Sequence, residues 1–324
     1  MKTVTFYQPF LNERGTCVAM VRWAHYNQTL LGNKSIFLYD SLDTRNVKDY
    51  IKELKKTFEV YDFKCGNCSV EERMKLIDDI LEQNNSKYLH ISKLGINDGV
   101  FSKKVKTIIS AAGMIHPDQA HGDVFTYVSY WSSNMCSSGK YPALPYIVEL
   151  PNENGNLRHQ LGISNEAIVF GRHGGEDTFD MPWAYSVISE ALDQKENIYF
   201  LFLNTKKFIE HDRVIFLDRI IDENHKTKFI NSCDAMLHVR FIGETFGMAC
   251  GEFSIRNKPV ITWYNSRERN HIDILQDKGI YYSTPQDLLD ILVSFTSLSD
   301  KDWNAYREYN PENMMQIFQN LLLD

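Results

Sequence analysis

The 324-residue chain lacks an excess of positive charge. It has 35 Lys and Arg residues against 42 Asp and Glu residues, which gives a formal net charge of −7. A protein that binds duplex nucleic acid needs a concentrated positive field, because it must displace counterions from the phosphates. We therefore expect no nucleic-acid partner, although a local basic pocket for one anionic ligand is compatible with this composition.

Long hydrophobic runs are missing as well. No stretch approaches the roughly 18 uncharged apolar residues that a membrane-spanning helix requires, and the apolar run at the amino end is too short for a signal peptide. Cysteine is scarce, and six cysteines in a chain of this length are typical of free thiols in a reducing compartment. These absences predict a cytoplasmic protein without a transmembrane segment.

Strand-like and helix-like segments alternate along the chain, which is typical of parallel sheets with helical crossovers. The length also exceeds what one hydrophobic core usually fills, so two domains are expected. The expected strands are short apolar runs, at residues 4–7, 35–40, 58–63, 87–92, 107–112, 124–128, 167–171, 198–203, 213–218, 235–239 and 258–263.

Three prolines and a glycine within residues 141–155 mark a hinge, because prolines in this number interrupt regular structure. We therefore expect an α/β fold with an N-terminal Rossmann-like domain over residues 1–148 and a C-terminal one over 149–300. Residues 301–324 are expected to form a C-terminal helix that packs back on the N-terminal domain. Ligands of such sheets bind at the carboxyl ends of the strands, so the cleft between the two halves is the expected site.

The segment Cys233–Trp263 carries the most informative pattern. It predicts a buried strand, a loop, and a helix that begins near Thr245 and ends before Lys258. Free amides in the first turn of that helix would form an anion site suited to a phosphate. Glu244 and Glu252 bracket this turn, so that one acid can face the reacting end of an extended ligand while the other accepts hydrogen bonds from a diol.

This segment resembles the E-x(7)-E region of retaining GT-B glycosyltransferases of the family 4 type. The resemblance rests on the block from Glu244 to Glu252, on the strand and loop before it with Arg240, and on VFGRHGG at residues 169–175. It implies two Rossmann-like domains facing a central cleft. It also implies transfer of a sugar from a UDP or GDP sugar to a glycan or other hydroxyl acceptor, with retention and without an obligatory metal or cofactor.

The resemblance assigns the donor to the C-terminal domain, where Glu244 would be the catalytic carboxylate and Glu252 would hold the donor ribose. The residues expected at the diphosphate are Arg172, His173, Arg240, Phe246 and Gly247. Each role has a structural alternative: Arg172 as a surface ion pair, Glu244 as an acid that complements the helix dipole, and Glu252 as a solvent-facing helical residue.

Four residues of the N-terminal domain are further candidates. His116 and His121 are candidate catalytic histidines for sugar binding or protonation, with a structural role in the turn as the alternative. On the acceptor side we expect Gly15, in the loop after the first strand, and Trp131, which is suited to stacking on a sugar but equally suited to core packing. The sequence carries no signal for the oligomeric state.

The chain departs from the family at one charge. Many members have a lysine-glycine pair after the arginine, whereas this chain continues with HGGEDTFDM and has no lysine there. Arg240, Lys206, the helix amides or a metal would then have to neutralise the leaving diphosphate. The alternative functions are a nucleotide-sugar epimerase on the same fold and a catalytically silent nucleotide- or carbohydrate-binding module.

Three further sequence patterns are weaker evidence for a function. RHGG at residues 172–175 is not G-x-G-x-x-G, so a nicotinamide-dependent dehydrogenase is disfavoured. Cys65 and Cys68 form C-x-x-C without a second pair at zinc spacing, which favours a turn with two free thiols. Asp300 and Asp302 have the D-x-D form of metal-dependent sugar transferases, but their position predicts the start of a late helix.

Overall fold

The computed structural model describes residues 1–296 and 300–323, which form two compact units. The first unit contains residues 1–147 and the segment from 309 onward, and the second contains 148–308. Segment 301–308, which we assigned to the C-terminal helix, therefore groups with the second unit. Residues 297–299 of the expected second domain, and residue 324, lie outside the described residues.

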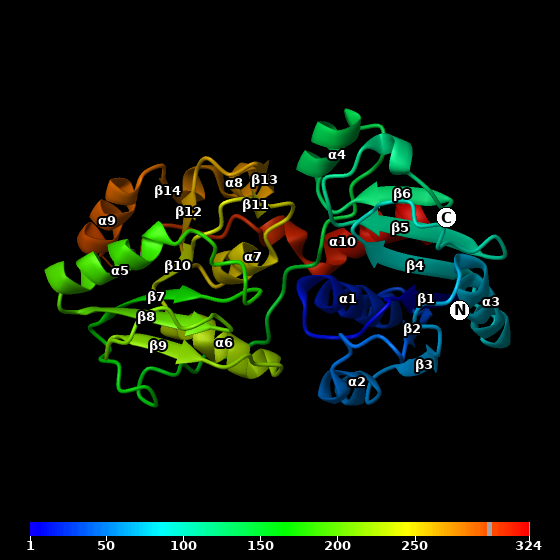
Figure 1. Cartoon of the computed structure of the whole chain (residues 1–324), viewed down its shortest axis with the longest axis horizontal. Helices are drawn as coiled ribbons and strands as arrows, with labels where there is room; N and C mark the ends of the chain where they lie inside the picture. The colour runs from blue at the N-terminus through cyan, green and yellow to red at the C-terminus, as the bar shows by residue number, and fades with distance from the viewer. Residues whose placement is uncertain (297–299, 324) are drawn as a thin grey trace. The chain divides into compact units, whose positions relative to one another are not determined.

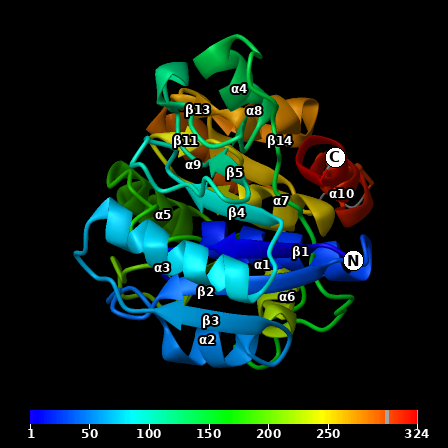
Figure 2. The same ribbon diagram turned by 90° about the vertical axis from the view of Figure 1, so that its right-hand side faces the viewer.

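The first unit is built on a six-stranded parallel sheet in the order β3-β2-β1-β4-β5-β6 (Figure 1). Figure 2 shows the strands from β3 to β5 one above another in this order. The strands are β1 (Thr3–Tyr7), β2 (Lys34–Asp40), β3 (Glu59–Phe63), β4 (Tyr88–Lys93), β5 (Lys106–Ala111) and β6 (Val124–Tyr127). The helices are α1 (Gly15–Thr29), α2 (Lys48–Leu54), α3 (Val70–Gln83), α4 (Tyr130–Ser137) and α10 (Pro311–Phe318).

The second unit has its own six-stranded parallel sheet, in the order β14-β12-β10-β7-β8-β9, and a short parallel pair, β11 with β13. The strands are β7 (Ile168–Arg172), β8 (Ile198–Leu203), β9 (Val214–Leu217), β10 (Ala235–His238), β11 (Gly243–Glu244), β12 (Val260–Trp263), β13 (Glu268–Arg269) and β14 (Gly279–Tyr282). The helices are α5 (Trp183–Gln194), α6 (Glu223–Ser232), α7 (Met248–Ile255), α8 (Asn270–Leu275) and α9 (Pro285–Ser294).

Apolar sequence runs become the strands because both faces of each sheet carry helices. In β8 every side chain except Tyr199 is buried, and the rings of Phe170 on β7 and Phe200 on β8 stack at 5.5 Å. The predicted apolar stripe of α5 packs into the same core. Each strand expected from the sequence is present within one or two residues of its predicted limits, and the α/β class is confirmed.

Helix α10 completes the core of the first unit (Figure 1). Phe318 at its end is fully buried. The ring lies 5.1 Å from Trp23 of α1, 6.5 Å from Phe6 of β1 and 5.7 Å from His90 of β4, measured between ring centroids. A segment from the far end of the chain thus covers the central strands of this sheet.

Two local predictions are wrong. Residues 300–306 form no helix, and the Asp302 carboxylate instead accepts hydrogen bonds from Lys278 Nζ at 2.9 Å and from the Asn304 amide at 3.0 Å. Cys65 and Cys68 are not free thiols but form a disulfide. Their Cα atoms lie 5.2 Å apart, which is within the range that a disulfide bridges.

Among the residues that the structure describes, no helix combines the length and the apolar composition needed to cross a membrane.

We expect Phe318→Ala to lower the free energy of unfolding of the first unit by about 3 to 5 kcal/mol, because it removes a buried ring and leaves a cavity. Urea denaturation followed by circular dichroism measures this change. Gln316→Ala, at an exposed position of the same helix, is the matched control and should change the free energy by less than about 0.5 kcal/mol. Equal losses in the two variants would contradict the anchoring role of the ring.

Candidate functional site

The carboxyl ends of two neighbouring strands bring the predicted donor-side residues together. In the second sheet β7 lies beside β10, and the strand order reverses between them, with β8 and β9 on one side and β12 and β14 on the other (Figure 1). β7 ends at Arg172, and β10 ends at His238, shortly before Arg240. Open α/β sheets bind ligands at such a reversal. We therefore take this edge of the sheet as the candidate site.

Arg172 is buried, with 3% of its surface exposed, and its guanidinium is bonded within the protein. Nη1 donates to Asn204 O at 3.0 Å and to Thr205 Oγ1 at 2.5 Å. Nη2 donates to Gly175 O and to Thr178 Oγ1, both at 2.6 Å. Burial lowers the pKa of Arg172 to about 10, so it stays charged at neutral pH. It holds the loops after β7 and β8 together and gives them a fixed positive charge.

Glu244 on β11 places its carboxylate against two basic side chains. Its Oε1 accepts a hydrogen bond from Arg240 Nη1 at 2.6 Å and another from His238 Nε2 at 3.3 Å. Burial alone would raise the pKa of Glu244, but the hydrogen bond from His238 and the charge of Arg240 outweigh it and lower that pKa to about 2. This carboxylate is therefore ionised at neutral pH. It can accept hydrogen bonds but has no proton to give as a general acid.

A chain of hydrogen bonds extends from Glu244 into the sheet. His238 Nδ1 lies 2.8 Å from Thr262 Oγ1 on β12, and that hydroxyl lies 3.1 Å from His271 Nε2 on α8. When His271 and His238 each donate from Nε2, the donors run in one direction from His271 to the carboxylate. Burial lowers the pKa of His271 well below its usual value, which agrees with the neutral form.

Glu252 on α7 is the other carboxylate of the candidate site, and it is buried, with 2% of its surface exposed. Its Oε1 accepts a hydrogen bond from Lys226 Nζ on α6 at 2.9 Å, and Lys226 also bonds Glu223 Oε1 at 2.8 Å. Its Oε2 lies 3.1 Å from His173 Nε2, without the angle of a hydrogen bond. The His173 ring in turn stacks on Phe253 at 5.7 Å. Glu252 is thus in contact with His173, the residue that follows Arg172 at the end of β7.

Helix α7 begins at Met248, later than the predicted start near Thr245. The reason is Gly247, whose φ of +87° is left-handed and cannot belong to the helix. A Cβ at this position would lie 2.9 Å from His271 Cβ and 3.0 Å from Tyr306 Oη, so a larger residue does not fit. Because glycine has no side chain, no side-chain cap covers the start of α7, and a ligand can approach its first-turn amides closely.

Two side chains hold the backbone of Phe246, the residue before Gly247, in place. Phe246 is buried, and its backbone carbonyl accepts hydrogen bonds from Asn270 Nδ2 and from Tyr306 Oη, both at 3.1 Å. Phe246 and Gly247 therefore contribute backbone, not side-chain chemistry, to the candidate site.

The loop after β7 is tied to the loop after β10. Asp180 Oδ1 accepts a hydrogen bond from the Phe241 amide at 2.7 Å. Lys206, which we considered as a replacement for the missing lysine, is mostly exposed and pairs with Asp177 at 3.2 Å. Over residues 1–296 and 300–323, no group of three or more His, Cys, Asp or Glu side chains is arranged to hold a metal ion.

The four candidates of the first unit differ in place and surroundings: Gly15, His116 and Trp131 follow the carboxyl ends of β1, β5 and β6, whereas His121 lies just before the amino end of β6. Gly15 is exposed and opens α1, where an added Cβ would meet no atom within 4 Å, and Trp131 is half-buried in the first turn of α4. His116 is 76% exposed in its side chain and pairs with Asp118 at 3.0 Å. His121 is buried, its Nδ1 lies 2.7 Å from the Gln119 carbonyl, and burial lowers its pKa.

Sequence reasoning missed three residues of the second unit. His238 was treated only as part of an apolar strand, although a histidine at the carboxyl end of a buried strand next to Arg240 is a usable signal. Lys226 and His271 come from separate helices, and nothing in their local sequence indicates that Lys226 bonds Glu252 or that His271 bonds Thr262 beside His238.

Solved structures with the same fold match the chain over its whole length. The crystal structure of HepE from Anabaena in complex with UDP and glucose has a TM-score of 0.71 at 13% identity and covers 100% of each chain. A glycosyltransferase from Rickettsia africae gives 0.68 at 14% identity, with 99% of this chain and 98% of that chain covered. A putative UDP-N-acetylglucosamine 2-epimerase from Listeria monocytogenes gives 0.63 at 12% identity, with 100% and 97% covered.

No family model matches the chain, and no curated protein matches its sequence. At 12 to 14% identity the structural likenesses establish the fold and leave the activity to be argued from the site. The predicted fold class is thereby confirmed: the chain has the GT-B fold of glycosyltransferases and nucleotide-sugar epimerases, with one Rossmann-like sheet in each unit.

Proposed function

We propose that the chain is a glycosyltransferase that moves a sugar from a nucleoside-diphosphate sugar to an acceptor hydroxyl, with retention of the anomeric configuration. One observation carries the proposal: the first turn of α7, opened by Gly247, has the carboxylate Glu244 before it and the buried carboxylate Glu252 within the helix. Amides suit a diphosphate, and carboxylates suit sugar hydroxyls, so this order along the chain matches the order of groups in a nucleotide sugar.

Glu252 is proposed to accept hydrogen bonds from the ribose hydroxyls. Lys226 bonds Oε1 at 2.9 Å, while His173 lies near Oε2 without a hydrogen-bonding angle. We assign the diol to the part of this carboxylate that faces the end of β7. The positive charge of Lys226 offsets part of the cost of burying the carboxylate.

The diphosphate is proposed to bind the first-turn amides of α7 with the help of Arg240 and His173. Arg172 contributes its charge from behind the loop, because both of its Nη groups already bond to protein oxygens. Arg240 then takes the place of the missing lysine, which requires it to share its guanidinium between Glu244 and phosphate oxygens.

In the proposed reaction the bond between the anomeric carbon and the diphosphate oxygen breaks as the acceptor oxygen bonds to that carbon on the same face. The acceptor proton passes to the leaving diphosphate, and the amides and Arg240 stabilise the negative charge that develops there. Glu244, ionised and held by His238, accepts hydrogen bonds from the donor sugar and orients it. UDP is the first nucleotide to test, since HepE was crystallised with UDP and with UDP-glucose.

A nucleotide-sugar epimerase remains the second candidate because of one observation. Epimerisation needs acid and base groups beside the sugar, and Glu244, His238 and His271 belong to one hydrogen-bonded chain through Thr262. A silent nucleotide- or carbohydrate-binding module is the third candidate. The three differ in what they do to a bound nucleotide sugar.

Incubation of the purified chain with UDP-glucose tests the proposed function. We expect release of UDP above the rate without protein, slowly to water and faster with an added sugar acceptor, and a higher melting temperature with UDP, because ligand binding stabilises the folded state. Chromatography of the products distinguishes the candidates: a new sugar epimer indicates the epimerase, and binding without turnover indicates the silent module. The absence of any effect of UDP or GDP on melting would contradict a donor site in the second unit.

We expect Glu252→Gln to raise the dissociation constant of UDP about 10- to 100-fold, because hydrogen bonds to a charged acceptor contribute about 1.5 to 3 kcal/mol. Isothermal titration calorimetry measures the constant. Glu223→Gln is the matched control, since Glu223 also bonds Lys226 but is not assigned to the ribose. An unchanged constant in a folded Glu252→Gln variant rules out the ribose role.

The low pKa of Glu244 predicts a pH-dependent stability. Because the folded pKa of about 2 lies below the ordinary value of 4.5, the ionised carboxylate stabilises the fold above about pH 4.5, and this contribution is lost as the pH falls toward 2. We expect Glu244→Gln to be less stable than the native chain by up to about 3 kcal/mol at pH 7, with the gap closing toward pH 2. Urea denaturation across this pH range measures it, and a gap independent of pH would contradict the assigned pKa.

A further inference from the structure

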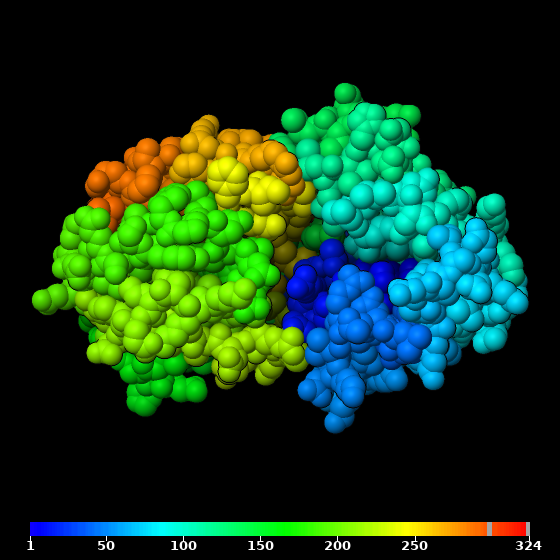
Figure 3. All heavy atoms as spheres, in the orientation of Figure 1, coloured from blue at the N-terminus to red at the C-terminus, as the bar shows by residue number. Residues whose placement is uncertain are grey.

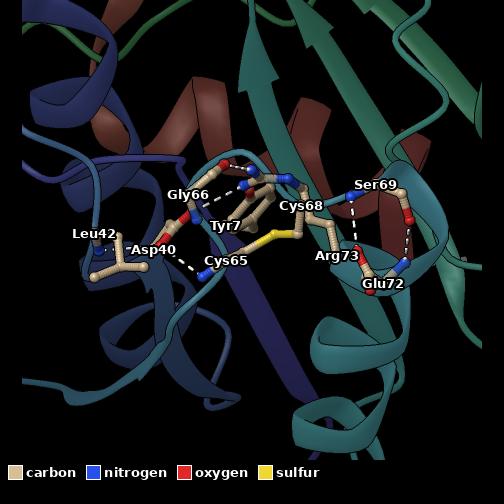
Figure 4. The surroundings of a disulfide bond; sticks show 9 residues. All are labelled: Tyr7, Asp40, Leu42, Cys65, Gly66, Cys68, Ser69, Glu72 and Arg73. Atoms are coloured by element: carbon tan, nitrogen blue, oxygen red, sulfur yellow. Dashed lines mark hydrogen bonds and ion pairs between the residues drawn. A yellow bond between two sulfur atoms is a disulfide. The ribbon is translucent and has the colours of Figure 1, made fainter.

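The disulfide of the first unit lies at a cavity that the proposed function does not use. A cavity of about 600 Å³ is lined by the ends of β1, β2 and β4 and by the turn between Cys65 and Cys68. The lining includes Tyr7, Asp40 and Arg73 together with Gly66 of the turn. In Figure 3 the light-blue surface of α3 adjoins the blue surface of the α2 and β3 segment. Figure 4 shows how the disulfide meets the cavity residues.

Asp40 depends on this turn for its hydrogen bonds. The carboxylate is buried and accepts from the Cys65 amide at 3.2 Å, from the Gly66 amide at 2.8 Å and from the Leu42 amide at 3.1 Å. Arg73 Nη1 approaches it at 3.3 Å (Figure 4). Two of these three backbone donors therefore belong to the segment that the disulfide closes. A buried carboxylate that loses such donors is destabilised, so Asp40 must follow any change in the turn.

Arg73 connects the turn to Tyr7 on the other side of the cavity. Its Nη2 donates to the Gly66 carbonyl at 2.8 Å, and its Nη1 donates to Tyr7 Oη at 3.3 Å. The turn, Asp40, Arg73 and Tyr7 thus form one connected network around the cavity. If the turn becomes mobile, Asp40 and Arg73 lose their hydrogen bonds to it at the same time.

The disulfide is more accessible than three of the four other cysteines. Cys65 and Cys68 are half-buried, whereas three of the four other cysteines, Cys17, Cys233 and Cys250, are buried. Burial raises the pKa of each of these three thiols, which keeps them protonated and unreactive. Reagents that exchange with sulfur therefore reach Cys65 and Cys68 before those three.

We propose that Cys65–Cys68 is a thiol–disulfide exchange site that switches the first-unit cavity between a fixed form, when oxidised, and a loosened form, when reduced. The reactant is a low-molecular-weight thiol such as glutathione. A thiolate attacks one sulfur, the disulfide bond breaks, and the other cysteine leaves as a thiolate and takes a proton. A second thiolate then attacks the sulfur of the bound thiol, which releases the protein cysteine as a thiolate that takes a proton. The protein thereby gains two electrons and two protons, and the two reactant thiols become a disulfide.

The change is local because the disulfide closes a loop of only four residues. Cross-links across short loops restrict the unfolded chain little, so the global stability depends weakly on this bond. The capping box of α3, in which Ser69 and Glu72 bond each other's backbone, holds the helix start in either redox state (Figure 4). Reduction of the disulfide is therefore expected to change the conformation of the turn, Asp40 and Arg73, and to leave the rest of the unit unchanged.

Equilibration of the native chain with reduced and oxidised glutathione tests the proposal. After acid quenching, unfolding and alkylation, mass spectrometry should count six reactive thiols at the reducing end and four at the oxidising end. Hydrogen–deuterium exchange of a peptide covering residues 63–69 should become about tenfold faster on reduction, while peptides from the central strands stay unchanged.

Two variants test whether the change in exchange comes from Cys65 and Cys68 or from another cysteine. Cys65→Ser combined with Cys68→Ser should show the fast exchange in every buffer, and Cys136→Ser, which removes the one half-buried cysteine outside the pair, should respond like the native chain. A count of six thiols at the oxidising end overturns the proposal. Equal exchange of residues 63–69 in the oxidised and reduced native chain overturns it as well, and both tests hold even where the double variant fails to fold.

Discussion

The buried guanidinium of Arg172 is the interaction on which the candidate site depends. It sits at the end of β7 and bonds the backbone or hydroxyl groups of two loops, one from its own strand and one from β8. Asn204 Nδ2 joins the same two loops by donating to the Gly174 carbonyl at 2.9 Å. A charged group in this position costs desolvation, and the four hydrogen bonds offset that cost. The edge of the sheet is thereby preorganised.

The two glutamates near α7 have different basic partners. Glu244 meets Arg240 and a histidine chain that leads back into the sheet, while Glu252 meets a lysine from α6. Each of the two carboxylates therefore has a basic partner from another element. The loop after β7 has no lysine between His173 and Met181, and the basic groups near Glu244 and Glu252 come from β10, the loop after it and α6.

The sequence predicted the sheets well because each strand is a short apolar run whose burial on both faces is a local property. It also predicted which residues lie at the carboxyl ends, since in parallel sheets this follows from strand limits alone. What it did not predict depends on contacts between distant segments. The late start of α7 results from the left-handed Gly247 packed against His271, and the bond between Lys226 and Glu252 joins two separate helices. The disulfide was missed because a C-x-x-C pair by itself does not report its redox state.

The position of α10 has a consequence for how the chain folds during synthesis. The first unit leaves the ribosome as far as Ile147, but the ring that covers Trp23 and Phe6 is at position 318, beyond the entire second unit. Until that residue is translated, an apolar groove on the nascent first unit stays open to water. The unit that is made first is therefore the last to be completed, and during this interval a chaperone or a neighbouring nascent chain has access to a surface that the finished protein never exposes.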